Sequence, residues 1–136
     1  MTPRRYVLVG CGVRGISMYA RPITKYYGDA AQLVAVCDTN RTRMSVCLQA
    51  CESDLPTFTS LDEMLRDMRP DALIVCTPDY THHDCIIRAL ESGADAITEK
   101  PMTIDETQCQ AVLDAEKRNR RNIIVTFNYR YAPKHQ

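Results

Sequence analysis

Apolar residues follow two different patterns along this chain. Short apolar runs predict strands near Tyr6–Val9, Leu33–Cys37, Ala72–Cys76, Ala96–Thr98 and Ile123–Phe127, with a weaker strand near Thr57–Phe58. Elsewhere, apolar residues recur at three- and four-residue spacing, which predicts helices with one apolar stripe each. The stripes are Met44, Cys47, Leu48 and Cys51; Leu61, Met64, Leu65 and Met68; Ile86, Ala89 and Leu90; and Cys109, Val112 and Leu113.

This alternation of strands and helices predicts an α/β fold. Continuous apolar strands are typical of a parallel sheet that is covered on both faces, and right-handed crossovers favour a doubly wound arrangement. We therefore expect a Rossmann domain, with a mostly parallel six-stranded sheet and helices on both faces.

Several residues mark where helices begin and end. Ser60 and Thr103 each stand three residues before a Glu, so both are predicted N-caps of capping boxes. Gly28 and Gly93 stand where helices should end. Pro22 falls inside the first helical stretch and predicts a kink or a break there.

Composition narrows the class of protein. A chain of 136 residues is one domain in length, and its 17 Lys and Arg balance 17 Asp and Glu. This balance gives no electrostatic reason to expect a nucleic acid or an anionic membrane as partner. Neither a long apolar run nor a signal peptide is present, and the seven cysteines form no Cys-x-x-Cys pair. We expect a cytoplasmic protein with reduced, mostly buried thiols rather than a disulfide framework or a metal site.

A glycine-rich loop follows the first predicted strand. Gly10-Cys11-Gly12-Val13-Arg14-Gly15 is a G-x-G-x-x-G sequence between a strand and a helix, the context in which this motif binds dinucleotides. Gly10 permits the tight turn, Gly12 lets the backbone approach a pyrophosphate, and Gly15 lets the helix pack on the strand. The amides from Val13 onward offer N–H groups to the phosphates. Arg14 either adds a cation there or faces solvent.

An acidic residue follows the second predicted strand. Asp38, next to Thr39, stands where a carboxylate accepts hydrogen bonds from the adenosine ribose and repels a 2′-phosphate, so it favours NAD over NADP. Arg41 keeps NADP open, because it could reach over a 2′-phosphate. The alternative is that Asp38 only caps the next helix. The loop and the acid alone also leave a methyltransferase open.

Polar residues follow the later strands as well, in Cys76–His83, Glu99–Pro101 and Asn128–Tyr131. Because the carboxyl ends of these strands share one edge of the sheet, these residues should converge beside the glycine loop, where a nicotinamide would lie. His82 should start a helix that faces this edge, and His83 should point to solvent. Two adjacent histidines do not share a helix face, so no metal pair is expected.

With these motifs in this order, the chain resembles the Gfo/Idh/MocA family, which includes glucose–fructose oxidoreductase and inositol 2-dehydrogenase. The resemblance rests on Gly10–Gly15, on Thr77–His82 (T-P-x-x-x-H), on Glu99-Lys100-Pro101 and on Asn128-Tyr129-Arg130, and it covers essentially the whole chain. Glu99-Lys100-Pro101 is its most specific element.

The resemblance implies roles for individual residues. Cys76, Thr77 and Pro78 would pass under the cofactor with His82 nearby, and Glu99 would contact the nicotinamide-side ribose. Lys100 would be the catalytic lysine and touch the substrate hydroxyl or the nicotinamide, while Asn128 and Arg130 would line the same mouth. Lys100 also has a physical rationale, because an ammonium beside a hydroxyl helps its proton to leave during hydride transfer. The alternative is a simple ion pair between Lys100 and Glu99.

The resemblance also implies how the protein is divided. Residues 1–128 would form the dinucleotide-binding domain, and residues 129–136 would start a linker to a substrate domain that the sequence does not contain. The expected function is hydride transfer between NAD(P) and a secondary alcohol of a sugar, cyclitol or related polyol. The alternatives are a non-catalytic nucleotide-binding module, half of an NAD-dependent glycosidase, or a methyltransferase. Without its second domain the chain would expose apolar surface near Tyr129–Tyr131, which favours a homo-oligomer.

Overall fold

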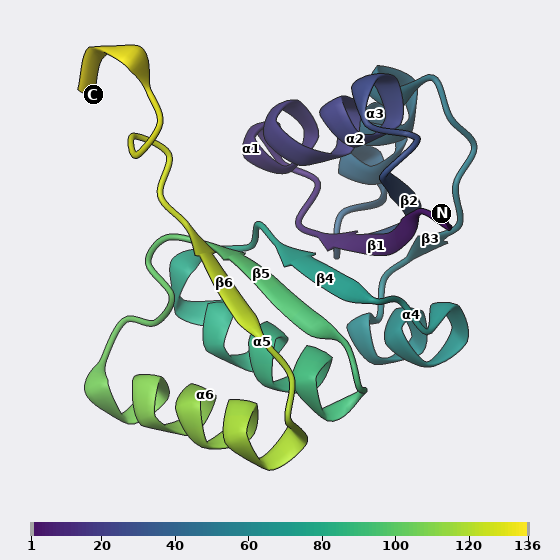
Figure 1. Ribbon diagram of the computed structural model, residues 1–136. Coiled ribbons are helices and arrows are strands. Elements are labelled where there is room, and N and C mark those ends of the chain that lie inside the picture. The colour runs from purple at the N-terminus through teal and green to yellow at the C-terminus, as the bar shows by residue number, and fades with distance from the viewer. Residues whose placement is uncertain (1, 136) are drawn as a thin grey trace.

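Six parallel strands form the centre of the molecule (Figure 1), in the order β3-β2-β1-β4-β5-β6. The computed structural model describes residues 2–135. The strands are β1 (Arg4–Val9), β2 (Ala31–Cys37), β3 (Thr57–Phe58), β4 (Ala72–Val75), β5 (Asp95–Glu99) and β6 (Ile123–Thr126). All neighbouring strands in the sheet pair in parallel, and this order is that of a Rossmann fold, as the sequence predicted.

Helices connect the strands. The longer ones are α3 (Arg41–Cys51), α4 (Leu61–Met68), α5 (His82–Glu91) and α6 (Glu106–Asn119). The helix after the glycine loop has three parts: α1 (Val13–Gly15), the π-helical turn η1 (Ile16–Ala20) and α2 (Arg21–Tyr26). Two short 3₁₀ turns complete the fold, η2 (Asp79–Thr81) and η3 (Pro133–His135).

The two faces of the sheet bury separate apolar cores. Val7 and Val9 of β1 pack toward α4, α5 and α6, whereas Leu8 packs toward η1 and α3. This division follows from the alternation of side chains along a strand. Figure 1 shows α5 and α6 on one face and α1 to α3 on the other. The stripe of α6 differs from the prediction, because Val112 is buried but Leu113 is 40% exposed.

The helix ends confirm part of what the capping residues predicted. The Ser60 hydroxyl accepts from the backbone N–H of Glu63, as expected of the N-cap of α4. Thr103, however, is not the N-cap of α6. That position belongs to Asp105, whose carboxylate accepts from the N–H of Gln108 at 2.8 Å. A carboxylate near the helix start also gains from the helix dipole.

Pro22 lies inside the first helix without breaking it, but the helical turn before it is widened. The π-helical turn η1 comes directly before it, and the N–H of Arg21 donates to the carbonyl of Ile16, five residues back. Proline has no N–H to continue the ordinary ladder. The helix nevertheless continues past Pro22 to Tyr26.

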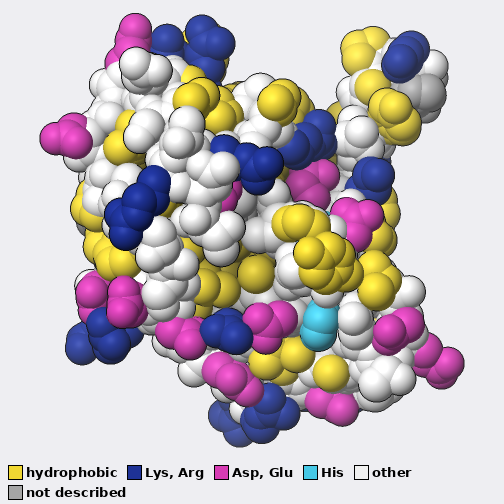
Figure 2. Space-filling model, turned by 180° about the vertical axis from the view of Figure 1, so that it is seen from behind, with side chains coloured by type: hydrophobic (Ala, Val, Ile, Leu, Met, Phe, Trp, Pro, Cys, Tyr) yellow, Lys and Arg dark blue, Asp and Glu magenta, His cyan; other side chains and the backbone are white. Residues whose placement is uncertain are grey.

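The surface and the thiols agree with the composition. In Figure 2, Lys, Arg, Asp and Glu side chains are interspersed over the face shown, without a large patch of one sign. All seven cysteines are free thiols, and most of them are buried. Within residues 2–135, no helix is both long and apolar enough to cross a membrane.

Candidate functional site

The glycine loop lies where β1 ends, pressed against the end of β4. Gly10 has φ +96°, and a Cβ built on it would lie 2.3 Å from the carbonyl oxygen of Cys76. A Cβ on Gly15 would lie 2.2 Å from the carbonyl oxygen of Gly10. Both positions therefore require glycine for reasons within the protein.

Gly12 is different from the other two glycines of the loop. Its φ is −80°, and a Cβ built on it would meet nothing within 4 Å. Neither backbone conformation nor packing therefore requires glycine at this position. A ligand that approaches the backbone closely is the remaining physical reason for it.

Asp38 is 8% exposed and holds the glycine loop in place. Its Oδ2 accepts from the N–H of Cys11 at 2.9 Å, and its Oδ1 accepts from the N–H of Asn40 at 2.8 Å. The N-cap of α3 is Asn40, so the alternative that Asp38 only caps this helix is wrong. An ionised carboxylate has about four acceptor positions, so two bonds leave capacity for ribose hydroxyls.

Two adjoining cavities run along the carboxyl edge of the sheet. The first, of about 580 Å³, is lined by residues that include Gly10, Gly12, Asp38, Thr39, Cys76, Thr77 and Pro78. The second, of about 300 Å³, is lined by Arg14, Cys76, Thr77, Asp79, His82, Glu99, Lys100 and Asn128. Cys76 and Thr77 border both cavities, so together they form one continuous site.

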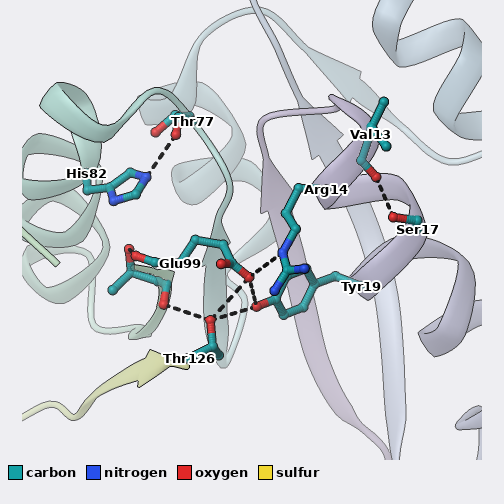
Figure 3. A network of polar contacts seen from close by, with 9 residues as sticks. Val13, Arg14, Ser17, Tyr19, Thr77, His82, Glu99 and Thr126 are labelled. Carbon is teal, nitrogen blue, oxygen red and sulfur yellow. Dashed lines mark hydrogen bonds and ion pairs between the residues drawn. The ribbon is translucent and has the colours of Figure 1, made fainter. Parts of the chain in front are cut away.

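Glu99 is the centre of a polar network in the second cavity (Figure 3). Its Oε1 accepts from Arg14 Nε at 2.9 Å, from the Tyr19 hydroxyl at 2.6 Å and from Thr126 Oγ1 at 3.2 Å. Burial alone raises the pKa of Glu99, but the hydrogen bonds from Tyr19 and Arg14 outweigh it, and the pKa lies below its ordinary value. Glu99 is therefore an anion in a nearly buried position.

Lys100 does not pair with Glu99. The Glu99 carboxylate takes Arg14 as its ion-pair partner, and residues 2–135 contain no ion pair to the exposed Lys100 side chain. The ion-pair alternative for Lys100 is therefore wrong. Lys100 lines the second cavity and also a shallow depression with Phe127, Asn128, Tyr129 and Arg130. The ammonium is thus placed at the mouth of the site.

His82 is buried, with 1% of its surface exposed. Its Nδ1 lies 2.6 Å from the carbonyl oxygen of Pro101, and its Nε2 lies 2.8 Å from that of Thr77. The ring therefore connects the loop after β4 to the loop after β5. A neutral imidazole donates only one of these two hydrogen bonds, and an imidazolium donates both. Because both ring nitrogens contact backbone carbonyls of the protein, the main role of His82 is to fix the shape of the site that it lines.

His83 does not point to solvent as the sequence predicted. The residue is half-buried, and its Nδ1 is enclosed without a hydrogen-bond partner among the described residues. It lies on α5 and lines neither of the two cavities. No group of three or more His, Cys, Asp or Glu side chains in residues 2–135 is placed to hold a metal ion.

Burial disfavours ionisation of two thiols at the site. Burial raises the pKa of Cys76 to about 12, and the negative charge of Glu99 adds to the effect. Burial likewise raises the pKa of Cys37 to about 12. Because only a thiolate reacts readily, these side chains serve as small apolar surfaces.

The structure also shows residues that sequence reasoning missed. Tyr19 and Thr126 bind Glu99 through tertiary contacts, and neither stands in a recognisable motif. The cations that line the first cavity are Arg43, in the first turn of α3, and Arg88 of α5, rather than Arg41. Of the predicted residues, Val13 is 85% exposed beside the loop and Gly15 is buried beneath it, so neither lines a cavity.

The comparisons with known proteins agree with this geometry. The profile of the oxidoreductase family with an NAD-binding Rossmann fold, Gfo/Idh/MocA, matches residues 4–127. The chain belongs to this oxidoreductase family. It is an NAD-binding Rossmann domain, and the methyltransferase alternative is thereby wrong.

Individual relatives are similar in sequence over nearly the whole of this chain. YteT of Bacillus subtilis (strain 168), a protein classed among the oxidoreductases, is 32% identical over 137 aligned residues, which cover 98% of this chain and 32% of YteT. The inositol 2-dehydrogenase of Rhizobium meliloti (strain 1021) is 31% identical, over 95% of this chain and 37% of that enzyme. This member of the family thus spans about a third of the length of the curated relatives that it matches.

A solved structure shows the same fold with ligands present. The WlbA dehydrogenase from Bordetella pertussis, in complex with NADH and UDP-GlcNAcA, superposes with a TM-score of 0.86 at 29% identity. The match covers 96% of this Gfo/Idh/MocA chain and 39% of the WlbA chain.

The lowered pKa of Glu99 predicts a pH-dependent contribution to stability. A carboxyl group whose folded pKa lies below its ordinary value of 4.5 contributes stability above that pH, and the contribution is lost as the pH falls through the folded pKa. We expect Glu99→Gln to lower the free energy of unfolding by about 1–2 kcal/mol near neutral pH. This penalty should shrink as the pH falls below 4.5.

Urea unfolding followed by circular dichroism over a pH series measures this difference. Glu91→Gln is the matched control, because Glu91 forms an exposed ion pair with Arg118. It should cost less than about 1 kcal/mol at every pH. A Glu99→Gln penalty that stays constant down to the acid limit would contradict the prediction.

Proposed function

We propose that this chain is the cofactor domain of an enzyme that transfers a hydride between NAD and a secondary alcohol of a sugar, cyclitol or related polyol. The observation that carries the proposal is the pair of adjoining cavities, which share Cys76 and Thr77, together with the open backbone of Gly12 in the first of them. A dinucleotide has two halves joined by a pyrophosphate, and two adjoining cavities beside the glycine loop match that shape.

The residues present fit such a cofactor. Asp38 and Thr39 would hold the adenosine ribose in the first cavity, and the pyrophosphate would lie against the amides that follow Gly12. Asp38 would repel the 2′-phosphate of NADP, although Arg43 lines the same cavity and could offset that repulsion. The nicotinamide would enter the second cavity, between Thr77 and Glu99.

The chemistry divides between the cofactor and the side chains. NAD, when bound, supplies the group that accepts or gives the hydride. Lys100, at the mouth of the second cavity, would hold the substrate hydroxyl and help to move its proton. Asn128 borders the same cavity, and Arg130 joins Lys100 in the adjoining depression, where both would orient the substrate.

Several observations support a further domain after residue 128. Relatives named inositol 2-dehydrogenase and the WlbA dehydrogenase are about two and a half times as long as this chain. At the C-terminal edge of the sheet, Ile124, Phe127 and Tyr131 are all more than half exposed. We infer that residues 129–136 begin the connection to a substrate domain that covers this apolar surface. Alone, the surface favours self-association.

A second candidate applies to the 136 residues by themselves, namely a module that binds NAD(H) without turnover. It is a candidate because Lys100 is the one residue among these 136 with a predicted catalytic role. We expect the chain to bind NADH in a fluorescence titration and to show no NAD⁺ reduction with a panel of inositols and sugars. Turnover with any of them would show that a second domain is dispensable.

Gly12 provides the sharpest test of cofactor binding. Gly12→Ala should leave the free energy of unfolding within about 1 kcal/mol, because the added methyl meets nothing in the protein. It should weaken NADH binding roughly 10-fold or more, since the methyl projects where the pyrophosphate would lie. Fluorescence titration and urea unfolding measure the two effects.

Gly28→Ala is the matched control. A Cβ on Gly28 also meets nothing within 4 Å, and Gly28 lines neither cavity of the site. Its NADH affinity should equal that of the wild type. Equal affinity in Gly12→Ala would remove the main support for the proposal.

Asp38 tests the choice between the two cofactors. Asp38→Ala should weaken NADH binding and raise the affinity for NADPH relative to NADH, because the charge that repels a 2′-phosphate is gone. The ratio of the two dissociation constants is the informative quantity, since loss of the bond to Cys11 loosens the loop for both cofactors alike. An unchanged ratio would argue against a ribose contact by Asp38.

A further inference from the structure

We propose that Tyr19 is a positioning residue for the cofactor site, which holds the Glu99 carboxylate so that one oxygen stays available to a bound hydroxyl group. The inference rests on the proposed function, because the hydroxyl would belong to the ribose of the cofactor or to the substrate. Tyr19 lies on the helix after the glycine loop, whereas Glu99 ends β5. Eighty residues of chain separate them.

The contacts of Glu99 fall on one oxygen only. Arg14, Tyr19 and Thr126 all donate to Oε1, and Tyr19 makes the shortest of the three bonds, at 2.6 Å. The other oxygen, Oε2, has no hydrogen-bond partner among residues 2–135 and is not among their enclosed, unpartnered atoms. Because Glu99 lines the cavity that Lys100 also borders, Oε2 is the acceptor left for a ligand.

Tyr19 is suited to this task because it remains a donor. Burial raises its pKa above the ordinary value, and the hydrogen bond to the Glu99 anion raises it further. Its proton is committed to Glu99. The single Thr126 proton has three acceptors within reach: Glu99, Tyr19 and the carbonyl of Thr98. Figure 3 shows how the tyrosine ring reaches across from the glycine-loop helix to this cluster.

The local fold explains why Tyr19 reaches Glu99. Tyr19 lies inside the π-helical turn Ile16–Ala20, which comes just before Pro22. Such turns are rare, and they frequently occur at functional sites. Proline at position 22 lacks the N–H that would continue the regular ladder just after this turn. From this turn the Tyr19 hydroxyl donates to Glu99.

Tyr19→Phe tests the inference with little change in shape. We expect NADH affinity to fall roughly 3- to 10-fold, the net effect of losing one typical hydrogen bond, because Tyr19 acts on the ligand only through Glu99. The effect should vanish in a Glu99→Gln background, because Tyr19 acts through Glu99. Carboxyl ¹³C resonances of Glu-labelled protein provide an independent readout without ligand. The Glu99 titration should move to higher pH in Tyr19→Phe, since a bond that lowers its pKa is gone.

Controls separate this inference from the proposed function. Tyr26→Phe removes a hydroxyl from a 73% exposed tyrosine of the same helix and should change neither readout. Thr126→Val is the second variant if Tyr19→Phe fails to fold, and it should shift the Glu99 titration in the same direction. A wild-type chain that does not bind NADH would overturn the proposed function. Wild-type binding with an unshifted Glu99 titration and unchanged affinity in Tyr19→Phe would overturn the role of Tyr19 alone.

Discussion

The structure depends on the close approach of the end of β1 to the end of β4. The N–H of Cys76 donates to the carbonyl of Val9 at 2.8 Å, and the N–H of Gly10 donates to that of Cys37 at 2.9 Å. Between these bonds no room remains for a Cβ at Gly10. The first loop is thereby held between the loops that follow β2 and β4. Both cavities of the site take one wall from this arrangement.

Two carboxylates then fix the loop at its two ends. Asp38 accepts from the backbone of Cys11 at the start of the loop, and Glu99 accepts from the side chain of Arg14 near its end. Both are less than a tenth exposed, and burial of an anion is costly unless hydrogen bonds compensate it. The N–H groups of Cys11 and Arg14, which compensate these two negative charges, therefore also order the loop. Each carboxylate keeps spare acceptor positions for a ligand in the cavities.

Most of the fold was predictable from local pattern, because most strands contain a short apolar run and the longer helices carry apolar residues at helical spacing. The start of α6 was not, since Thr103 and Asp105 are both capable caps. Asp105 takes the role, and the side chain of Gln108 in turn accepts from the N–H of Ile104. Which of two competing caps wins depends on such neighbours.

The residues of the site were likewise predictable only in part. Its glycines, Asp38 and the residues after β4 and β5 stand in motifs, so their convergence followed from topology. The pairing of Glu99 did not, because sequence adjacency suggested Lys100. The Glu99 carboxylate instead pairs with Arg14, which the glycine loop brings to it from far away in the sequence. Tyr19, Thr126 and Arg43 belong to no motif and enter the site only through tertiary packing.

The central place of β1 also bears on the order in which the molecule assembles. Of the six strands this one is synthesised first, yet its two neighbours are β2 and β4, and the latter ends only at Val75. Long-range parallel pairings form slowly, and unpaired strand edges invite association with other chains. During synthesis, one side of the strand that leads into the glycine loop must therefore stay unpaired until β4 has emerged.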